Sequence, residues 1–247
     1  MLTLILAAQL QADLRPITLS VEGVERQLLA YSPKSPEKAP IVLVFHGHGG
    51  TGRSMARRLA IHKLWPEAVV LYPQGLPTAG KFDPDGKQAG WQKGSGSEGD
   101  RDLKFFDSML AELAKRKLGD PAKVYVTGHS NGGGFTYLLW GARGSKVAAV
   151  APSAAGGNVF TLKPKPCLHS AGEKDTRVPY ENQRRVMDAV LRLNGAENKG
   201  KPWMKLGTWH DSKNKTPFVE VVHPGGHEIP AQTGAWIVAF FKVIASE

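Results

Sequence analysis

Short apolar runs rich in β-branched residues recur along this chain of 247 residues, and most are separated by stretches with the apolar spacing of an amphipathic helix. The strand-like runs lie at 41–45, 68–72, 123–127, 147–151, 166–170 and 218–222. The helical stretches lie at 54–62, 102–118, 131–141, 180–193 and 233–244. Continuous apolar strands that alternate with helices are typical of a parallel sheet covered on both faces. The pattern therefore predicts an α/β fold with a mostly parallel central sheet.

Residues 17–32 alternate apolar and polar side chains around Glu22-Gly23, which predicts an N-terminal antiparallel hairpin. Two long stretches, 74–99 and 196–217, do not fit the alternation of strands and helices. Loops longer than about 12 to 15 residues in a compact domain are usually functional or disordered, so both are candidates for walls of a substrate site. The chain has no internal repeat and no linker that would separate a second domain or a cap. Residues 13–247 are expected to form one domain.

The first twelve residues, 1–12, carry an apolar run that is far shorter than the ~20 residues needed to span a bilayer. They resemble the tail of a secretory signal with a small residue, Ala12, at the cleavage point, although no basic residue precedes the apolar run. The alternative is a disordered or strand-like terminus. We expect export, so that the protein is secreted or periplasmic.

The composition excludes a disordered, a collagenous and a disulfide-stapled protein. An apolar fraction of 41% suffices for a core, and Cys167 has no partner in the chain for a disulfide. The formal net charge is +10, but the basic residues are scattered and form no stripe of the kind that binds nucleic acid. We interpret the charge as a solvated basic surface and expect no nucleic-acid partner. The oligomeric state stays open.

A Gly-x-Ser-x-Gly motif centred on Ser130 lies between a strand-like run and a helical stretch. In the nucleophile elbow, this motif holds a serine in a strained, sharp turn that exposes its hydroxyl, and the two glycines let the strand and the helix approach each other. The alternative is a glycine-rich turn in which Ser130 only caps the helix. Because the strand and the helix fall where the elbow requires them, we predict that Ser130 is a nucleophile.

A serine hydroxyl is a weak nucleophile at neutral pH, so it needs a base within hydrogen-bond reach and an acid that orients the base. In proteins with the elbow, the acid and then the histidine follow the serine, each after a later strand. Asp175 follows the run 166–170 and His227 follows the run 218–222, so we assign them as acid and base.

Two neighbours compete for these roles. Glu173 lies two residues before Asp175, which could instead cap a helix, and His223 lies closer to its strand than His227 does. The glycines at 225 and 226 favour His227, because they let the loop fold back over the end of the strand.

Residues 46–50, after the first apolar run, read His-Gly-His-Gly-Gly. With Gly52 they match the Gly-x-Gly-x-x-Gly of dinucleotide-binding proteins, but the next strand has no acidic residue at its tip to hold a ribose. The loop suits an oxyanion hole better, since fixed backbone amides stabilise the charge that develops on a carbonyl oxygen under attack. We assign the amides of His48 and Asn131 to this role, with Gly49 as the alternative to His48. Two alternate histidines without nearby Cys, Asp or Glu are a poor ligand set, so no metal is expected.

These motifs together resemble the α/β-hydrolase esterases that are grouped with polyhydroxybutyrate depolymerases and with feruloyl or acetylxylan esterases. The likeness spans roughly residues 15–243 and is carried by segments 44–50, 100–103, 124–133, 172–180, 193–195 and 225–230. It implies a secreted serine esterase that acts on short-chain polyesters or on acyl esters of cell-wall polymers and needs no cofactor. The chain departs from many such proteins in having one cysteine, and in having Ile229 where a tryptophan is common.

Trp91, in the long stretch 74–99, is predicted to form an aromatic wall of the acyl or alcohol pocket, with a core position as the alternative. Two other functions stay open. One is an inactive protein of the same fold that binds anionic glycans, and the other is a serine peptidase, although such peptidases typically carry an additional domain. Measurable ester hydrolysis distinguishes the first of these from an esterase, and amide cleavage assays test the second.

Overall fold

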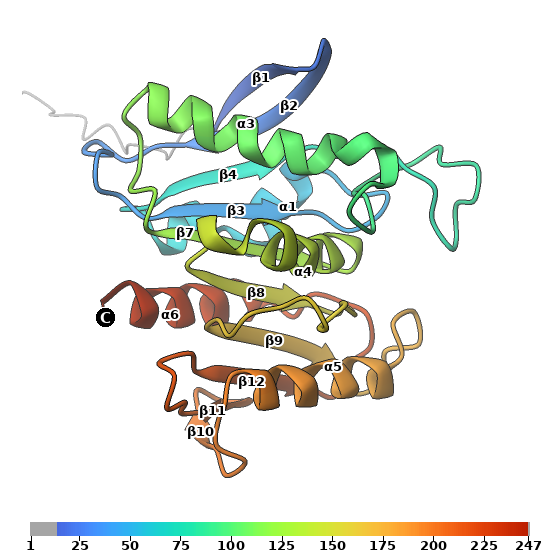
Figure 1. The fold of residues 1–247 in the computed structure, drawn as a ribbon, viewed down its shortest axis with the longest axis vertical. Coiled ribbons are helices and arrows are strands. Elements are labelled where there is room, and N and C mark those ends of the chain that lie inside the picture. The colour runs from blue at the N-terminus through green and yellow to red at the C-terminus, as the bar shows by residue number, and fades with distance from the viewer. Residues whose placement is uncertain (1–13, 247) are drawn as a thin grey trace, which may run out of the picture.

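The structure of the chain is a computed structural model that describes residues 14–246, so the signal-like segment 1–12 lies outside the described residues. Within them, one ten-stranded sheet has the strand order β1-β2-β4-β3-β7-β8-β9-β12-β11-β10 (Figure 1). Its strands are β1 (Arg15–Val21), β2 (Val24–Tyr31), β3 (Ile41–Phe45), β4 (Val69–Pro73), β7 (Val124–His129), β8 (Ala149–Ser153), β9 (Cys167–Gly172), β10 (Lys201–Trp203), β11 (Gly207–His210) and β12 (Phe218–His223).

The central strands, from β4 to β12 in this order, all run parallel. They are the apolar runs expected from the sequence, and each starts within two residues of its predicted start. The N-terminal hairpin is β1 and β2, which pair antiparallel and join the sheet beside β4. The prediction of an α/β fold with a mostly parallel sheet and an N-terminal antiparallel hairpin is confirmed.

Helices cover both faces of the sheet, with one group in front of it and the other behind it in Figure 1. The front group is α3 (Arg101–Lys115), α4 (Asn131–Arg143) and α5 (Tyr180–Leu193), and the back group is α1 (Gly52–Leu59), α2 (Ile61–Leu64) and α6 (Thr233–Ser246). Alternate side chains of β3 serve the two cores, because Leu43 packs with the front group and Val44 with the back group. In the part of the chain that the structure describes, no helix has the length and apolar character required to cross a membrane.

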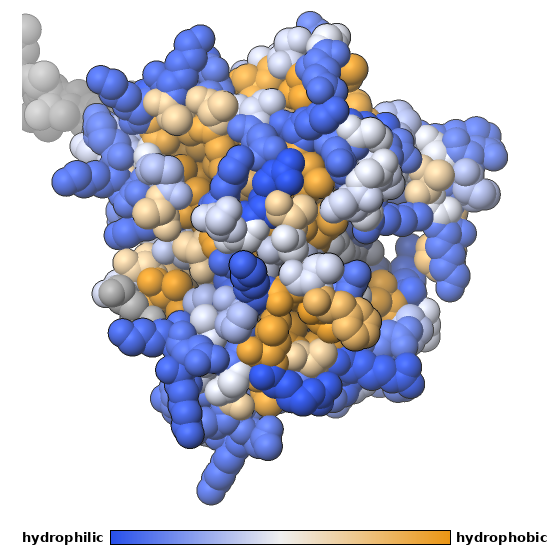
Figure 2. All heavy atoms as spheres, in the orientation of Figure 1, coloured by the Kyte–Doolittle hydropathy of each residue, from blue (hydrophilic) through white to orange (hydrophobic). Residues whose placement is uncertain are grey.

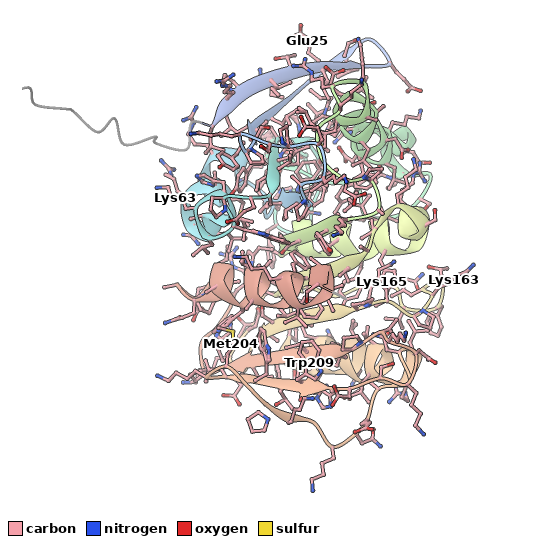
Figure 3. The ribbon with its side chains drawn as sticks, turned by 90° about the vertical axis from the view of Figure 1, so that its left-hand side faces the viewer. Glu25, Lys63, Lys163, Lys165, Met204 and Trp209 are labelled. Atoms are coloured by element: carbon pink, nitrogen blue, oxygen red, sulfur yellow. The ribbon has the colours of Figure 1, made fainter. Side chains whose placement is uncertain are left out.

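Residues 196–217 contain β10 and β11, an antiparallel hairpin that extends the sheet beside β12. Figure 3 shows Trp209 at this end of the molecule and Glu25 at the opposite end. The ring of Trp209 lies 6.0 Å from that of Phe240 in the core behind the sheet. The prediction that this stretch forms a wall of a substrate site is wrong, because its strands extend the sheet and none of its residues lines the hollows beside Ser130.

Residues 74–99 contain the short strands β5 (Leu76–Pro77) and β6 (Ala89–Gly90) and part of a 3₁₀ turn, Ser97–Asp100. A buried ion pair holds this stretch against the start of α3. Arg26 donates to Asp102 at 2.7 Å, and the other carboxylate oxygen of Asp102 accepts the Gln92 amide at 2.7 Å. The Gln92 side chain in turn accepts the amides of Asp102 and Leu103. These hydrogen bonds join the loop 74–99, which borders the candidate site, to α3 and β2. Losing either Arg26 or Asp102 would leave an uncompensated buried charge.

Candidate active site

The carboxyl ends of the parallel strands point to one edge of the sheet, on the right in Figure 1. The loops that follow β3, β7, β9 and β12 carry His48, Ser130, Asp175 and His227 respectively. Parallel strands bring such loops together whatever their separation in sequence, and this edge is where α/β proteins bind ligands. The structure therefore gathers the predicted site residues in one place.

Ser130 lies in the turn between β7 and α4 with φ 56° and ψ −120°. A positive φ is costly for a residue with a Cβ, so the backbone is strained here, as the elbow motif predicts. The flanking glycines explain how the turn closes. A Cβ at Gly128 would lie 2.4 Å from the Gly132 carbonyl oxygen, and one at Gly132 would lie 2.4 Å from the Phe45 carbonyl oxygen. Alanine at either position would force the strand and the helix apart.

Ser130, His227 and Asp175 form a chain of hydrogen bonds. The Ser130 Oγ lies 2.8 Å from His227 Nε2, and His227 Nδ1 lies 2.8 Å from Asp175 Oδ2. An ionised carboxylate only accepts hydrogen bonds, so Nδ1 carries the proton and donates to Asp175. Nε2 is then unprotonated and accepts the hydrogen bond of the serine hydroxyl. This is the arrangement in which a histidine can remove a proton from a serine.

The carboxylate of Asp175 is fully buried and is held by three further donors. Its Oδ1 accepts the backbone amides of Arg177 and Val178, each at 2.9 Å. Its Oδ2 accepts the Gln183 side-chain amide at 3.0 Å in addition to His227. Four donors fix the plane of the carboxylate and compensate for its removal from water.

Behind Asp175, a buried hydrogen-bond network continues through Gln183 and His169 to Tyr137 on α4. Both hydrogens of the Gln183 amide are used, by Asp175 and by the Val178 carbonyl, so its oxygen accepts from His169 Nε2 at 3.3 Å. His169 Nδ1 consequently accepts the Tyr137 hydroxyl at 2.7 Å. Burial lowers the pKa of His169 to about 4, so its imidazole is neutral at neutral pH. The donors from Tyr137 through His169 and Gln183 thus form a chain that ends at the Asp175 carboxylate.

The competing residues lie elsewhere. Glu173 is exposed, and His223 is buried with its Nδ1 accepting the Gly225 amide at 3.3 Å. His129 packs beside His227, and the centres of the two rings are 5.0 Å apart. Burial, and then the neighbouring His227, lower the pKa of His129 to about 3, so its ring stays neutral and places no fixed charge next to His227.

Two backbone amides beside Ser130 are candidates for an oxyanion hole, those of Asn131 and His48. Asn131 is the first residue of α4, where an amide has no partner within the helix. The Gly49 amide donates to the Ala89 carbonyl at 2.8 Å and is not available, whereas the His48 amide forms no hydrogen bond within residues 14–246. Of the two alternatives that the sequence left open, His48 is the one with a free donor.

Asp83 is a residue of this site that sequence reasoning missed. Its carboxylate accepts His48 Nε2 at 3.1 Å and the amides of Lys87 and Gln88 at 3.1 and 2.8 Å. These hydrogen bonds, led by that of Gln88, hold the pKa of Asp83 below its usual range. Within the described residues no cluster of three or more His, Cys, Asp or Glu side chains could hold a metal ion. Because Asp83 accepts both His48 and two amides of its own loop, it anchors the loop of His48 to residues 83–88.

Trp91 does not form a wall of a pocket. It is fully buried, stacks on Phe135 at 5.4 Å, and donates from Nε1 to the His46 carbonyl at 2.8 Å. Its backbone pairs with the Asn131 side chain, since Oδ1 accepts the Trp91 amide and Nδ2 donates to its carbonyl. The prediction of an aromatic wall of the acyl or alcohol pocket is wrong, and the core alternative describes the residue. Trp91 ties the loop 74–99 to the first turn of α4.

Two hollows meet at Ser130. The larger, about 770 Å³, lies between α4 and the loop 74–99, and its floor includes Phe135, Tyr137 and Leu138. The smaller, about 320 Å³, is lined by His129 and His227 among others. Ser130 and His48 line both. Figure 2 shows the surface hollowed beside the loop 74–99, which projects on the right, with apolar residues next to the hollow.

This chain has the α/β-hydrolase fold, with a strained serine, an aspartate and a histidine placed after three of its parallel strands, β7, β9 and β12. The acetyl xylan esterase from Aspergillus awamori superposes on it with a TM-score of 0.73 at 15% identity, covering 93% of this chain and 99% of that one. A thermostable esterase superposes with a TM-score of 0.65 at 20% identity, covering 95% of this chain and 63% of that one.

In sequence, the chain is similar to feruloyl esterases. Feruloyl esterase D from Neurospora crassa is 32% identical over 195 residues, which are 73% of this chain and 64% of the relative. Feruloyl esterase B from Piromyces equi is 29% identical over 127 residues, which are 47% of this chain and 24% of the relative. The chain thus spans between about a quarter and about two thirds of the length of these curated relatives. No family model matches it. The resemblance to α/β-hydrolase esterases that the sequence motifs indicate is confirmed.

Proposed function

We propose that residues 13–247 form the catalytic domain of a carboxylic ester hydrolase in which Ser130 is the nucleophile, His227 the general base and Asp175 the residue that orients the base. The observation that carries this proposal is the hydrogen-bonded chain Ser130–His227–Asp175, with both links at 2.8 Å. The names of the relatives support ester hydrolysis. Short-chain polyesters and acyl esters of cell-wall polymers are the substrate classes that we propose. The signal-like residues 1–12 favour a secreted or periplasmic location.

In the proposed reaction, His227 Nε2 takes the proton of Ser130 as Oγ attacks the ester carbonyl carbon. The tetrahedral intermediate collapses when the bond to the alcohol oxygen breaks, and His227 gives its proton to the leaving alcohol. An acyl group is then esterified to Ser130. Water, deprotonated by His227, attacks this acyl-enzyme, and the acid leaves as Ser130 regains its proton.

The amides of Asn131 and His48 are the proposed oxyanion donors. Removal of one such donor in other hydrolases costs about 3 kcal/mol in the transition state. The Asn131 backbone amide is held in place by α4. The Asn131 side chain forms two hydrogen bonds with the Trp91 backbone, which hold the residue further. The His48 amide is fixed by the anchor to Asp83 and by the neighbouring Gly49 amide, which is bonded to Ala89. Both donors are thus preorganised, which is the condition for effective stabilisation.

The test is replacement of the nucleophile. Ser130→Ala should lower kcat for p-nitrophenyl butyrate by about 10⁴ or more and abolish covalent labelling by a fluorophosphonate probe. Ser108→Ala, on α3 with its hydroxyl bonded to the Lys104 carbonyl, is the matched control and should keep both. A wild-type protein that neither turns over esters nor reacts with the probe would identify an inactive binding protein instead.

A further inference from the structure

The two hollows at Ser130 differ in which part of an ester they can accept. His227 has to protonate the leaving alcohol, so the alcohol oxygen must lie on the side of its imidazole. The smaller hollow is lined by His227, whereas the larger one is not. If Ser130 attacks an ester as proposed above, the alcohol occupies the smaller hollow and the acyl group extends into the larger one.

The larger hollow combines an apolar floor with a basic rim. The floor contains Phe135, Tyr137 and Leu138 from α4, and a Cβ built at Gly134 would meet only the Gly156 carbonyl oxygen at 3.7 Å, so the space there is open. This shape accepts an extended acyl chain or an aromatic ring.

The rim carries three cationic side chains, Lys81, Lys93 and Arg177, all of them exposed. Arg177 lies where the two hollows meet and also lines the smaller one, whereas Lys81 and Lys93 line the larger one alone. Among residues 14–246, no aspartate or glutamate lines the hollow. Some other basic residues of the surface are paired, as Lys87 is with Asp85 and Lys146 with Asp107. Within residues 14–246, none of the three rim cations has a carboxylate within 4.0 Å of it.

Two of these cations share an aromatic neighbour. Lys81 Nζ lies 5.5 Å from the centre of the Phe82 ring, and the Arg177 guanidinium carbon lies 5.9 Å from it. Phe82 is 66% exposed, so its ring supports the two cations at the mouth of the hollow. Clustered charge of one sign at the mouth of a cleft concentrates ligands of the opposite sign.

From this arrangement we propose that the larger hollow selects acyl groups that carry a carboxylate at the end distant from the ester. The methylene chain or ring of such a group lies on the apolar floor, and its carboxylate reaches the rim of Lys81, Lys93 and Arg177. The substrate class is therefore half-esters of dicarboxylic acids and acidic ends of oligoesters. This inference rests on the proposed ester hydrolysis and adds the charge of the substrate to it.

The experiment compares matched esters with one leaving group. Mono-p-nitrophenyl adipate carries a terminal carboxylate, and p-nitrophenyl hexanoate is its neutral counterpart of the same chain length. The suberate and octanoate esters repeat the comparison with a longer chain. For each pair, the ratio of the two kcat/KM values is measured, with the Ser130→Ala variant supplying the rate of spontaneous hydrolysis. The ratio cancels any change in folding or in the catalytic chain.

We expect the wild-type ratio to favour the anionic ester and to fall about fivefold to tenfold in the triple variant Lys81→Gln, Lys93→Gln, Arg177→Gln, since exposed ion pairs are individually weak. The control triple variant Lys38→Gln, Lys63→Gln, Lys123→Gln changes net charge equally. Lys38 and Lys123 precede β3 and β7 at the opposite edge of the sheet, and Lys63 lies in α2 behind the sheet. Its ratio should match that of the wild type. Salt raised from about 0.05 M to about 0.5 M should lower the wild-type ratio.

Two outcomes would overturn the proposal, and they are distinguishable from each other. Hydrolysis of both esters with a ratio that the rim variant leaves unchanged, or that the control variant lowers equally, refutes the selection of anionic acyl groups and leaves ester hydrolysis standing. No hydrolysis of any of the four esters by the wild type refutes the proposed function and this inference together.

Discussion

Two aspartate–histidine pairs meet at Ser130 from different loops, and they are built differently. Asp175 binds His227 at 2.8 Å and is completely removed from solvent, with four donors on its carboxylate. Asp83 binds His48 at 3.1 Å, and its carboxylate and the His48 ring are 8% and 22% exposed. The Asp83 carboxylate has three donors, two of which are amides of its own loop.

The difference follows from which part of each histidine matters. In the proposed reaction, His227 acts through its ring, so Asp175 must fix the tautomer and the orientation of the imidazole. His48, as a proposed oxyanion donor, contributes its backbone amide, so Asp83 only has to hold the loop in place. The first pair therefore needs a rigid, fully satisfied carboxylate, whereas the second tolerates a longer hydrogen bond and partial exposure. Replacing each aspartate in turn should therefore lower kcat by different amounts.

Asp175→Asn should have the largest effect. The amide of asparagine can donate a hydrogen bond to His227 Nδ1, which stabilises the tautomer with its proton on Nε2, and this tautomer cannot accept the proton of Ser130. We expect kcat for p-nitrophenyl butyrate to fall by about 10⁴. Steady-state kinetics and circular dichroism of the variant provide the measurement and the folding control. A loss smaller than about tenfold in a folded variant would contradict the assignment of Asp175.

Asp83→Asn should have a smaller effect, mainly on kcat. The new amide group replaces one acceptor oxygen and weakens either the bond to His48 or the bonds to the loop amides. Because the His48 amide would be displaced rather than removed, we expect about a tenfold loss, below the 10²-fold to 10³-fold loss that follows complete removal of an oxyanion donor.

The neighbouring Asp85 provides the control for this variant. Its carboxylate is 69% exposed and pairs with Lys87, and Asp85→Asn makes the same charge change two residues away. Asp85→Asn should leave kcat within about twofold of the wild type, since surface substitutions of this kind have small effects. Equal losses in the two variants would show that charge rather than anchoring of His48 is responsible.

The sequence predicted the parts of this comparison that depend on strand ends. Periodicity located the parallel strands, and the loops that follow them carry Ser130, Asp175 and His227, so their convergence follows from the topology alone. Glycine spacing also pointed to the strained backbone of Ser130. These features are local in sequence or are imposed by a regular sheet.

The features that the sequence did not reveal depend on packing between loops. Asp83 lies 35 residues from His48, in a turn whose Asp-Pro-Asp-Gly composition gives no sign of a partner. Trp91 is buried because the Asn131 side chain and the Phe135 ring capture it, which no spacing rule anticipates. The hairpin of residues 196–217 was missed because its strands are short and polar. Side-chain contacts of this kind require coordinates.

The Asp175–His227 pair is backed by a buried network that contains a titratable residue, so the stability of the protein should depend on pH in acid. Behind Asp175 lies the buried, neutral His169, whose pKa is lowered to about 4 by burial. An unfolded chain binds a proton at this residue below a pH of about 6.5, whereas the folded chain does not until about pH 4. The free energy of unfolding must therefore fall as the pH falls through this window, by at most about 1.4 kcal/mol per pH unit for this one group.

His169→Gln removes the titration and keeps an amide that can donate to Gln183, so the variant tests this group within the network. Other buried histidines with lowered pKa values, such as His129 and His46, still give the variant some acid sensitivity. Urea unfolding at half-unit intervals between about pH 7 and about pH 4.5 measures the slope for both proteins. The slope of the variant should be shallower by up to about 1.4 kcal/mol per pH unit, whatever its absolute stability. Parallel slopes would mean that His169 is protonated equally in the folded and unfolded chains, and that the network behind Asp175 is not held in its neutral form by burial.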